Sequence, residues 1–241
     1  VLPLSQLWNF DKLGDSDFDV STMKVPDKED IAQAMAKVDY TQLKYDDATG
    51  ILTTENPDIQ IELGAIGKGY AIEQAKDVLK RSDASGGMVS AGSSIYVCGT
   101  KKDGSRFRVA LRDPRGDENS AIGVLTLSDT TISTSGDYER YFEKDGKTYH
   151  HIIDPATGYP ADSGLKSVTI ISSDGTLADG LSTSLFIMGI DKAKEYWRAN
   201  SDKFDAILLT NDNKQYVTEG IYSDYSTDYP VEKIKKENHN E

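Results

Sequence analysis

The chain has 241 residues and a formal net charge of −13, with 37% hydrophobic and 28% charged side chains. This length can bury a sizeable core, and no apolar run reaches the ~18 residues that a membrane helix needs. So acidic a chain, without a concentrated basic patch, is unsuited to nucleic acid because phosphate repels it. The single cysteine, Cys98, excludes an internal disulfide and a cysteine zinc site. The first residues carry no signal-peptide pattern.

The hydrophobic pattern predicts helices and strands that follow one another in mixed order. Helical periodicity is found over residues 27–38, 70–81, 177–188 and 192–199. A hairpin is predicted from 43–45 and 51–53 around a turn that ends at Gly50. Further strands are predicted over 59–63, 88–97, 107–111, 124–127, 149–153, 167–171, 206–210 and 215–218.

The order of these elements indicates the fold class. Helices and strands mix without strict βαβ alternation, which predicts an α+β fold with a mainly antiparallel sheet and packed helices. We expect one domain over residues 1–222, followed by a polar C-terminal tail over 223–241.

A glycine-rich stretch, ELGAIGKGY, begins at Glu62 between a predicted strand and a predicted helix. Its three glycines let the backbone approach a ligand, and the helix N-terminus adds positive potential. Lys68 would place a point charge on a phosphate. The spacing is neither a Walker loop nor GxGxxG, and the alternative is a tight connection with a solvated lysine.

Two adjacent histidines, His150 and His151, precede the turn sequence DPATG, and the third, His239, lies near the C-terminus. A histidine acting as general base would come from this pair, since neutral imidazole accepts protons near neutral pH. On a strand the two side chains face opposite sides, so only one of them enters a given pocket. The alternative is two surface histidines beside a loop.

The helix predicted over 177–188 places Asp179 and Thr183 one turn apart, on the face opposite Leu177 and Leu181. A carboxylate and a hydroxyl at this spacing supply two hard oxygen ligands of the kind that Mg²⁺ accepts. The alternative is an aspartate placed early in a helix because the helix dipole favours it there.

A hydroxyl-rich segment, STSGDY, begins at Ser133. Its small polar side chains are suited to holding a phosphate. The same residues are also typical of a helix start, at Ser135 or Asp137. Both interpretations stay open at this point.

In this order, the four stretches resemble those of the ApbE family. ELGAIGKGYAIE is similar to its D/E-L-G-x-I-A-K-G-Y segment, and STSGDYERYF followed by YHHIIDPATGYP resembles S-G-D-Y…H-I-I-D-P-x-T-G-x-P. SVTIISSDGTLADGLSTSLFIMG resembles its closing V-T-V…A-D-x-x-x-T…G segment, and LWNFD its tryptophan-containing strand. The resemblance extends from about Leu7 to about Gly220 and implies a T-fold-related, ApbE-like domain.

The resemblance implies an activity and its residues. Family members transfer FMN from FAD onto a threonine hydroxyl of an acceptor flavoprotein, with Mg²⁺, and release AMP. It implies that His151 is the base that takes the threonine proton. The implied metal ligands are Asp179, Thr183 and the backbone carbonyl of Ala65, and the implied FAD contacts are Glu62, Lys68, Ile152, Trp8 and Asn9.

The resemblance also implies partners and a location. We expect FAD as substrate, Mg²⁺ as cofactor, an acceptor flavoprotein with a target threonine, and no nucleic acid. We further expect an extracytoplasmic, membrane-anchored lipoprotein, held by a lipidated N-terminus that is not present in this chain. The sequence departs from the family in lacking a substantial portion before LWNF, and in having Gly92-Ser93-Ser94 where relatives show Gly-Gly-Asp/Asn.

Three alternative functions are considered. The first is an FAD pyrophosphatase that gives FMN and AMP, with water in place of the threonine. The second is a non-catalytic flavin-binding carrier, against which the joint presence of His151, Asp179 and Thr183 argues. The third is a serine hydrolase using Ser135, although the Gly-x-Ser-x-Gly elbow of such enzymes is missing.

Overall fold

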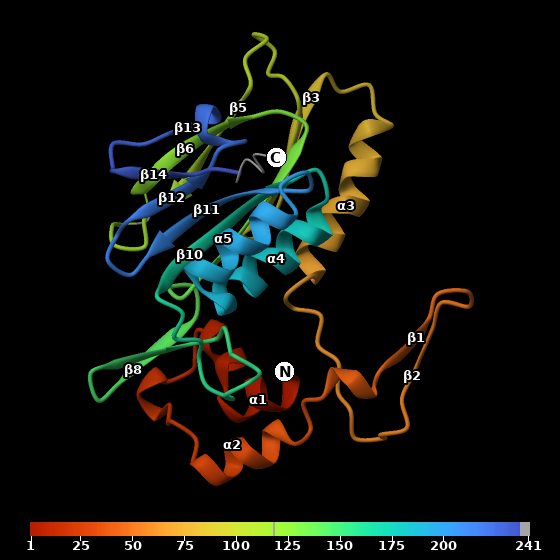
Figure 1. Cartoon of the computed structure of the whole chain (residues 1–241), viewed down its shortest axis with the longest axis vertical. Helices are drawn as coiled ribbons and strands as arrows, with labels where there is room; N and C mark the ends of the chain where they lie inside the picture. The colour runs from red at the N-terminus through yellow and green to blue at the C-terminus, as the bar shows by residue number, and fades with distance from the viewer. Residues whose placement is uncertain (118, 237–241) are drawn as a thin grey trace, which may run out of the picture. The chain divides into compact units, whose positions relative to one another are not determined.

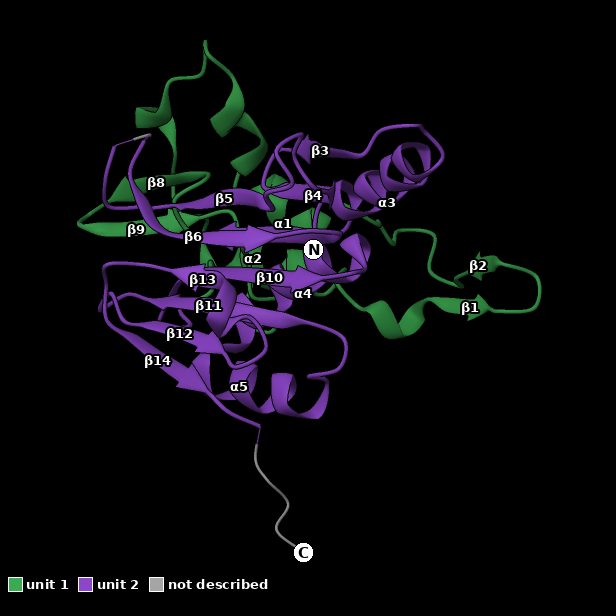
Figure 2. Cartoon of the chain, turned by 90° about the horizontal axis from the view of Figure 1, so that it is seen from above, with its two compact units in different colours: residues 1–63, 137–161 green, residues 64–136, 162–241 purple. Residues whose placement is uncertain are grey.

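The computed structural model describes residues 1–117 and 119–236, which form two compact units (Figure 2). Unit 1 comprises residues 1–63 and 137–161, and unit 2 comprises residues 64–136 and the described residues from 162 onward. Each unit is therefore assembled from two stretches of chain that are far apart in the sequence.

Unit 2 is organised around two sheets. Its strands are β3 (Gly86–Ala91), β4 (Ser94–Gly99), β5 (Phe107–Arg112), β6 (Ala121–Leu127), β7 (Thr130–Gly136), β10 (Leu165–Ser172), β11 (Asp205–Thr210), β12 (Gln215–Thr218), β13 (Tyr225–Ser226) and β14 (Val231–Ile234). Seven form one sheet in the order β14-β12-β11-β10-β7-β4-β3, and three form a smaller sheet in the order β13-β6-β5 (Figure 1). Of these pairs only β12 and β14 run parallel. The predicted antiparallel α+β class is therefore confirmed.

The core of unit 2 lies between these two sheets. Val97, Ile132 and Leu209 of the large sheet pack in one cluster with Val109 and Leu125 of the small one, and each is at most 7% exposed. Alternate residues of the large sheet point to its other face. There α3 (Gly67–Lys80) packs on β3 and β4, α4 (Gly175–Met188) on β7 and β10, and α5 (Ile190–Ala199) on β11 (Figure 1).

Unit 1 is smaller and has an aromatic core. It contains α1 (Leu2–Leu7), α2 (Lys28–Met35), the hairpin of β1 (Lys44–Asp46) and β2 (Ile51–Thr53), and the hairpin of β8 (Tyr141–Lys144) and β9 (Lys147–His150). Trp8 stacks on Phe10 with ring centroids 5.7 Å apart, and Phe142 stacks on Tyr149 at 5.2 Å. Because aromatic rings bury large areas, this cluster supplies much of the packing of a unit with little sheet.

The β1–β2 hairpin projects from the rest of unit 1 as a narrow ribbon (Figures 1 and 2). All of its strand residues are exposed, including the apolar Tyr45 at 62% and Ile51 at 56%. Gly50 closes its turn with a φ of 69°, a left-handed conformation that glycine adopts without strain. The Lys44 ammonium lies 3.3 Å from the Glu55 carboxylate next to the strand ends.

Most elements predicted from the sequence are confirmed. The four predicted helices correspond to α2, α3, α4 and α5, and the first predicted hairpin is β1–β2. Two strand predictions need correction. No strand forms over 59–63, and the run over 88–97 is two strands, β3 and β4, that reverse direction at Gly92, where φ is 61°.

Three further predictions also differ from the structure. The hydroxyl-rich segment that begins at Ser133 is the end of strand β7, so it starts no helix. LWNFD forms the end of α1 and a 3₁₀ helix over Phe10–Gly14, where the resemblance implies a strand. The strand predicted over 149–153 ends at His150, because the chain turns away into the DPATG loop.

The predicted polar tail contains structure in its described part. Residues 222–224 form a 3₁₀ helix, β13 pairs with β6, and β14 adds a parallel edge strand beside β12. Ile234 is only 3% exposed, so this segment is anchored by apolar burial despite its many charges. Residues 237–241 of the predicted tail, including His239, lie outside the described residues.

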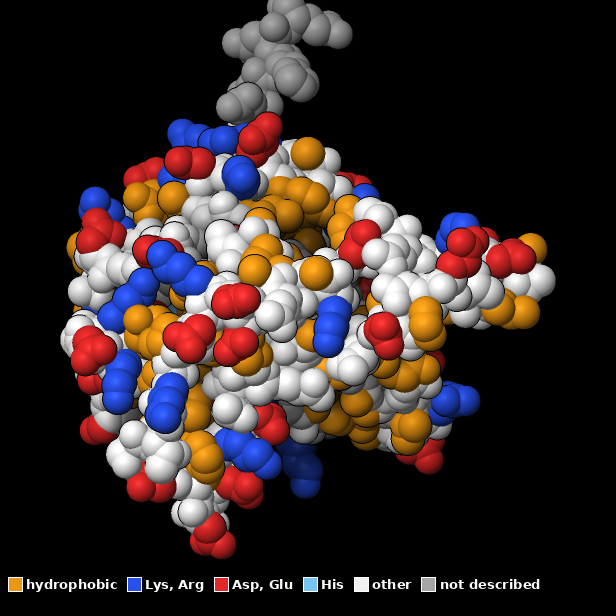
Figure 3. Space-filling view, turned by 90° about the horizontal axis from the view of Figure 1, so that it is seen from below, with side chains coloured by type: hydrophobic (Ala, Val, Ile, Leu, Met, Phe, Trp, Pro, Cys, Tyr) orange, Lys and Arg blue, Asp and Glu red, His pale blue; other side chains and the backbone are white. Residues whose placement is uncertain are grey.

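The surface carries charges of both signs. On the face shown in Figure 3, acidic and basic side chains are intermingled. Among the helices of the described residues, none combines the length and the apolar character that a membrane crossing requires.

Candidate functional site

Asp179 on α4 is a buried charged residue among the candidates, with 1% exposure. Helix α4 begins at Gly175 because the Asp174 side chain accepts a hydrogen bond from the Leu177 backbone N–H at 2.9 Å. Asp179 follows one turn later. A buried carboxylate is unfavourable unless charged or hydrogen-bonding partners surround it, so its neighbours decide what it can do.

Three groups meet the Asp179 carboxylate. Oδ2 accepts a hydrogen bond from the Gly69 backbone N–H at 2.8 Å, and Oδ1 accepts one from Ser133 Oγ at 3.2 Å. The Lys68 ammonium lies 3.3 Å from Oδ1. Because Lys68 and Gly69 belong to the first turn of α3, the carboxylate sits at that helix N-terminus, where unpaired N–H groups and the helix dipole stabilise negative charge.

The Lys68 side chain is only partly withdrawn from solvent. It is 40% exposed, and Nζ also donates to the carbonyl of Gly64 at 3.4 Å. Lys68 is therefore paired with Asp179, yet part of it still faces outward. A positive charge in this position can contact an anion such as a phosphate.

The hydroxyls next to Asp179 come from the strand that α4 covers. Ser133 and Ser135 are two residues apart on β7, so they share a face. Ser133 contacts Asp179, and Ser135 Oγ lies 3.0 Å from Thr183 Oγ1. The two spacings match, since two strand residues and one helical turn each span about 5 to 7 Å. Ser135 thus supports Thr183, and Ser133 supports Asp179.

Ala65 and Glu62 lie in the loop that leads into α3, and both are exposed. Ala65 belongs to unit 2 and precedes the turn that carries Lys68, whereas Glu62 belongs to unit 1. The Ala65 carbonyl therefore lies on the segment that leads into α3, and the Asp179 carboxylate contacts the N-terminus of this same helix. The predicted FAD contact of Glu62 stays a prediction.

The side-chain oxygen atoms of Asp179 and Thr183 are of the type that binds a hard cation such as Mg²⁺. Asp179 offers a carboxylate, and the Thr183 hydroxyl can donate to Ser135 while keeping lone pairs for a cation. Among the described residues, no group of three or more His, Cys, Asp and Glu side chains is placed to hold a metal ion. A cation here would rely on one carboxylate, completed by hydroxyl and backbone oxygens.

Unit 1 holds the two histidines in different surroundings. His150 ends β9 and is 7% exposed, with Nε2 lying 3.0 Å from the Ala161 carbonyl oxygen. His151 follows the strand and is partly exposed. Its backbone N–H donates to the Arg140 carbonyl at 3.0 Å, and its Nδ1 lies 3.3 Å from the same oxygen.

These contacts indicate which histidine can act as a base. A carbonyl oxygen only accepts hydrogen bonds, so the ring nitrogen that faces it carries the proton in the neutral imidazole. In His151 this assigns the proton to Nδ1 and the lone pair to Nε2. Since His151 is also the more exposed of the two, its geometry is compatible with the role that the sequence analysis assigns to it.

Trp8 and Ile152, the predicted flavin contacts in unit 1, are core residues. Trp8 is 1% exposed and donates from Nε1 to the Gly158 carbonyl at 2.9 Å. Ile152 is 4% exposed, and its carbonyl accepts from the Ala161 N–H at 2.9 Å. The Trp8 side chain therefore supports the core of unit 1, the Ile152 side chain is buried, and a contact of either with FAD stays a prediction.

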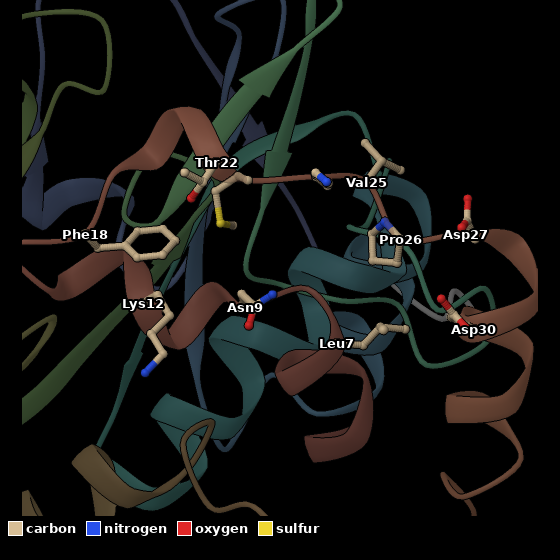
Figure 4. Close-up of a pocket in the computed structure, with 11 residues that line it drawn as sticks. Leu7, Asn9, Lys12, Phe18, Thr22, Val25, Pro26, Asp27 and Asp30 are labelled. Carbon is tan, nitrogen blue, oxygen red and sulfur yellow. The ribbon is translucent and has the colours of Figure 1, made fainter.

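Asn9 lines a pocket of about 400 Å³ within unit 1 (Figure 4). Its φ of 55° is left-handed, a conformation that asparagine adopts more readily than most residues. The lining includes the acidic Asp27 and Asp30 and the basic Lys12 and Lys24. With both signs present, the pocket has no simple preference for an anion, and the predicted FAD contact of Asn9 is untested.

The predicted residues thus fall into two groups. In unit 2 the structure brings together Lys68 and Asp179, with Thr183 one turn further along α4. In unit 1 it places His151 directly after strand β9 and before the buried Ile152, while Trp8 belongs to the aromatic core. Sequence reasoning did not identify Ser133 as a contact of Asp179, although Ser133 and Ser135 are two residues apart and would share one face if the segment is a strand.

Comparison with known proteins gives consistent matches. Residues 1–208 match the sequence model of the ApbE family. The FAD:protein FMN transferase of Klebsiella pneumoniae strain 342 is 35% identical over 208 residues, which are 86% of this chain and 61% of that protein. The protein of the same name from Vibrio cholerae is 33% identical over 219 residues, 90% of this chain and 63% of its own. The chain therefore spans 61% and 63% of the length of these curated relatives.

A solved structure shows the same architecture. The crystal structure of the ApbE protein from Thermotoga maritima aligns with a TM-score of 0.79 at 34% identity, and the match covers 93% of this chain and 70% of that chain. This similarity agrees with the mixed helices and mainly antiparallel sheets described above.

Proposed function

We propose that this chain, which belongs to the ApbE family, catalyses the transfer of FMN from FAD to a threonine hydroxyl of an acceptor flavoprotein. The observation that carries the proposal is the buried Asp179 carboxylate, held at the N-terminus of α3 beside the Lys68 ammonium. A paired negative and positive charge at a helix N-terminus is suited to a pyrophosphate and its counter-cation. The similarity to two FAD:protein FMN transferases also supports it.

The proposed reaction is a phosphoryl transfer. His151 Nε2 accepts the proton of the threonine hydroxyl, and the threonine oxygen attacks the phosphorus attached to riboflavin. The bond from this phosphorus to the bridging oxygen breaks, and AMP leaves with that oxygen. The products are FMN joined to threonine through a phosphoester and free AMP, so the atoms balance. Such a reaction needs positioning and charge neutralisation more than covalent catalysis by the protein.

The proposal includes Mg²⁺, for which Asp179, Thr183 and the backbone carbonyl of Ala65 would be the ligands. Held there, Mg²⁺ would supply positive charge that offsets the negative charge of the pyrophosphate and of the leaving AMP. Lys68 contributes a second positive charge, and Ser133 and Ser135 hold Asp179 and Thr183 in place. The proposed FAD contacts are Glu62, Lys68, Ile152, Trp8 and Asn9.

Mass spectrometry of the acceptor tests this function. A threonine-bearing acceptor flavoprotein is incubated with the chain, FAD and Mg²⁺, and compared with the same acceptor after replacement of its threonine by alanine. We expect an FMN-sized mass gain that requires the threonine and Mg²⁺. It should fall by at least ~100-fold in His151→Ala, since general-base catalysis contributes that much or more.

Two aspartate variants complete the design. Asp179→Asn keeps an oxygen that accepts from Gly69 but loses the charge, so it separates metal binding from helix capping; we expect transfer to be lost. Asp191→Asn, an exposed aspartate in the first turn of α5, is the charge-matched control and should transfer normally. Free FMN and AMP with an unmodified acceptor would identify a hydrolase, and intact bound FAD would identify a carrier.

The proposal also extends to location, as an extracytoplasmic, membrane-anchored lipoprotein. Support comes from the family resemblance. Cells that produce the protein can be fractionated, and the membrane fraction analysed for a lipid-modified N-terminal peptide. Recovery of the unmodified protein from the cytoplasmic fraction would overturn this part of the proposal.

A further inference from the structure

Helices α3 and α4 are joined by two reciprocal hydrogen bonds, in which a carboxylate of each helix accepts a backbone N–H from the N-terminus of the other. Asp179 of α4 accepts the Gly69 N–H of α3 at 2.8 Å, and Glu73 of α3 accepts the Gly175 N–H of α4 at 2.6 Å through Oε1. In each helix the donating glycine and the accepting carboxylate are four residues apart, so they lie on one face. Each helix therefore donates one first-turn N–H to a carboxylate of the other helix, and accepts one N–H from it through a carboxylate of its own.

The two glycines make this exchange possible. A Cβ at Gly69 would lie 2.1 Å from the Gly175 carbonyl oxygen and 2.7 Å from the Asp179 Cβ. A Cβ at Gly175 would lie 3.0 Å from both the Gly69 carbonyl oxygen and Glu73 Oε1. The backbones of the two first turns are thus in direct contact, and movement of one turn displaces the carboxylate that the other presents.

Glu73 is itself held by a buried lysine. The Lys76 ammonium lies 3.2 Å from both oxygens of Glu73 and also donates to the Ser173 carbonyl, and Lys76 is 9% exposed. Ser173 directly precedes Asp174, the residue that caps α4. Glu73 and Lys76 therefore hold the chain on both sides of the α4 cap.

We infer that Glu73 is a positioning residue, which sets the start of α4 and through it the place of the Asp179 carboxylate. One helical turn joins Gly175 to Asp179, and a hydrogen-bonded turn moves as a unit. This inference rests on the proposed function, in which Asp179 is a metal ligand. Groups that orient a metal ligand typically change metal affinity about 10- to 100-fold when they are removed.

Three variants test the inference in the whole chain. Glu73→Ala removes the acceptor for Gly175 and the partner of Lys76. Glu73→Gln keeps an oxygen that can accept from Gly175 but loses the charge. Asp77→Ala is the control, because it removes an exposed carboxylate one turn further along the same helix.

The first measurement is amide hydrogen exchange at Gly69 and Gly175, followed by NMR. Loss of a local contact alone accelerates exchange at Gly175, the direct partner of Glu73. If Glu73 positions Asp179, Glu73→Ala accelerates exchange at Gly69 as well, although Gly69 donates to Asp179. We expect both amides to exchange at least ~10-fold faster in Glu73→Ala, with a smaller change in Glu73→Gln and none in Asp77→Ala. Wild-type exchange at Gly69 in both Glu73 variants would overturn the inference.

The second measurement is titration with Mn²⁺ alone, followed by electron paramagnetic resonance. We expect about 10-fold weaker binding in Glu73→Ala, partial recovery in Glu73→Gln, and no binding in Asp179→Asn. Unchanged binding in Glu73→Ala, alongside loss in Asp179→Asn, would overturn the positioning role and leave the metal site intact. Binding retained in Asp179→Asn would refute the metal assignment of the proposed function, while the Gly69 exchange still decides the role of Glu73.

Discussion

Units 1 and 2 hold their candidate catalytic side chains in different ways. In unit 2, Asp179 is 1% exposed and is fixed by a backbone N–H, a hydroxyl and an ammonium from two other elements. In unit 1, His151 lies beyond the end of a short hairpin, is partly exposed, and directs its backbone N–H and Nδ1 to the Arg140 carbonyl. In this molecule a buried charge is held by a large sheet and its helices, while the side chain proposed as the proton acceptor is placed by a local turn.

The most damaging substitution we expect separates α3 from α4. Gly69→Ala forces a Cβ to within 2.1 Å of a backbone oxygen, and neither helix can yield without losing the exchanged hydrogen bonds. We expect a loss of at least about 3 kcal/mol in the free energy of unfolding. Chemical denaturation followed by circular dichroism measures it.

Gly67→Ala is the matched control, because Gly67 lies in the same first turn and a Cβ there meets nothing within 4 Å. Alanine is the better helix former, so this variant should match the wild type or gain up to about 1 kcal/mol. Equal stability of the two variants would show that the helices do not approach each other this closely.

The next effect concerns the aromatic core of unit 1. Trp8→Ala should lower the unfolding free energy of unit 1 by about 3 to 5 kcal/mol, as for other large buried aromatics. Trp8→Phe keeps a ring against Phe10 but leaves the Gly158 carbonyl without its donor, so we expect a smaller loss of about 1 to 3 kcal/mol.

The two tryptophans of the chain make this test specific. Trp197, 1% exposed, belongs to unit 2, so in Trp8→Ala its fluorescence reports on unit 2 alone. If the units differ in stability as their cores suggest, circular dichroism detects an early transition while the Trp197 transition stays at the wild-type denaturant concentration. Coincident transitions would show that the two units unfold cooperatively.

A weaker effect is a pH dependence within unit 2. Burial raises the pKa of Asp205 above its usual value of 3.8, against the lowering effect of the hydrogen bond from Thr218. Because the folded state favours the protonated form, stability is fullest below the unfolded pKa and declines as pH rises through the folded pKa. Asp205→Asn should therefore be more stable than the wild type at neutral pH, with the difference vanishing in acid.

Melting temperatures over a range of pH measure this difference. Asp212→Asn is the control with the opposite sign, because hydrogen bonding to Lys214 lowers the pKa of Asp212. That variant should lose a little stability at neutral pH and none below the folded pKa. A constant offset of Asp205→Asn at every pH would show that the carboxyl titrates as it does in the unfolded chain.

The fold was predictable where the signal is local. The periodic apolar residues of α3 and α4 identify both helices, and the turn before Gly50 identifies the first hairpin. Strand β7 was missed because TTISTSG carries one large apolar residue, Ile132, and the face that meets α4 carries the hydroxyls of Ser133 and Ser135. The reversal at Gly92 was missed because the residues on both sides of it have strand character.

The candidate site was predictable only in part. Asp179 and Thr183 are one turn apart, so helical geometry alone relates them. Gly69 and Asp179 are 110 residues apart, and no local pattern indicates that one donates to the other. Glu73 was not identified at all, since a glutamate on an amphipathic helix gives no sign of the helix N-terminus that it contacts.

The exposed β1–β2 hairpin is a suitable place to insert additional residues. Within the described part of the chain its strands pair only with each other, and the residues of its turn are exposed. Added residues between Asp47 and Ala48 would lengthen a loop that solvent already surrounds, and the entropy of closing a loop grows slowly with its length. An affinity tag, a fluorophore or a protease site can therefore be grafted there, which makes unit 1 addressable without touching the residues proposed for catalysis.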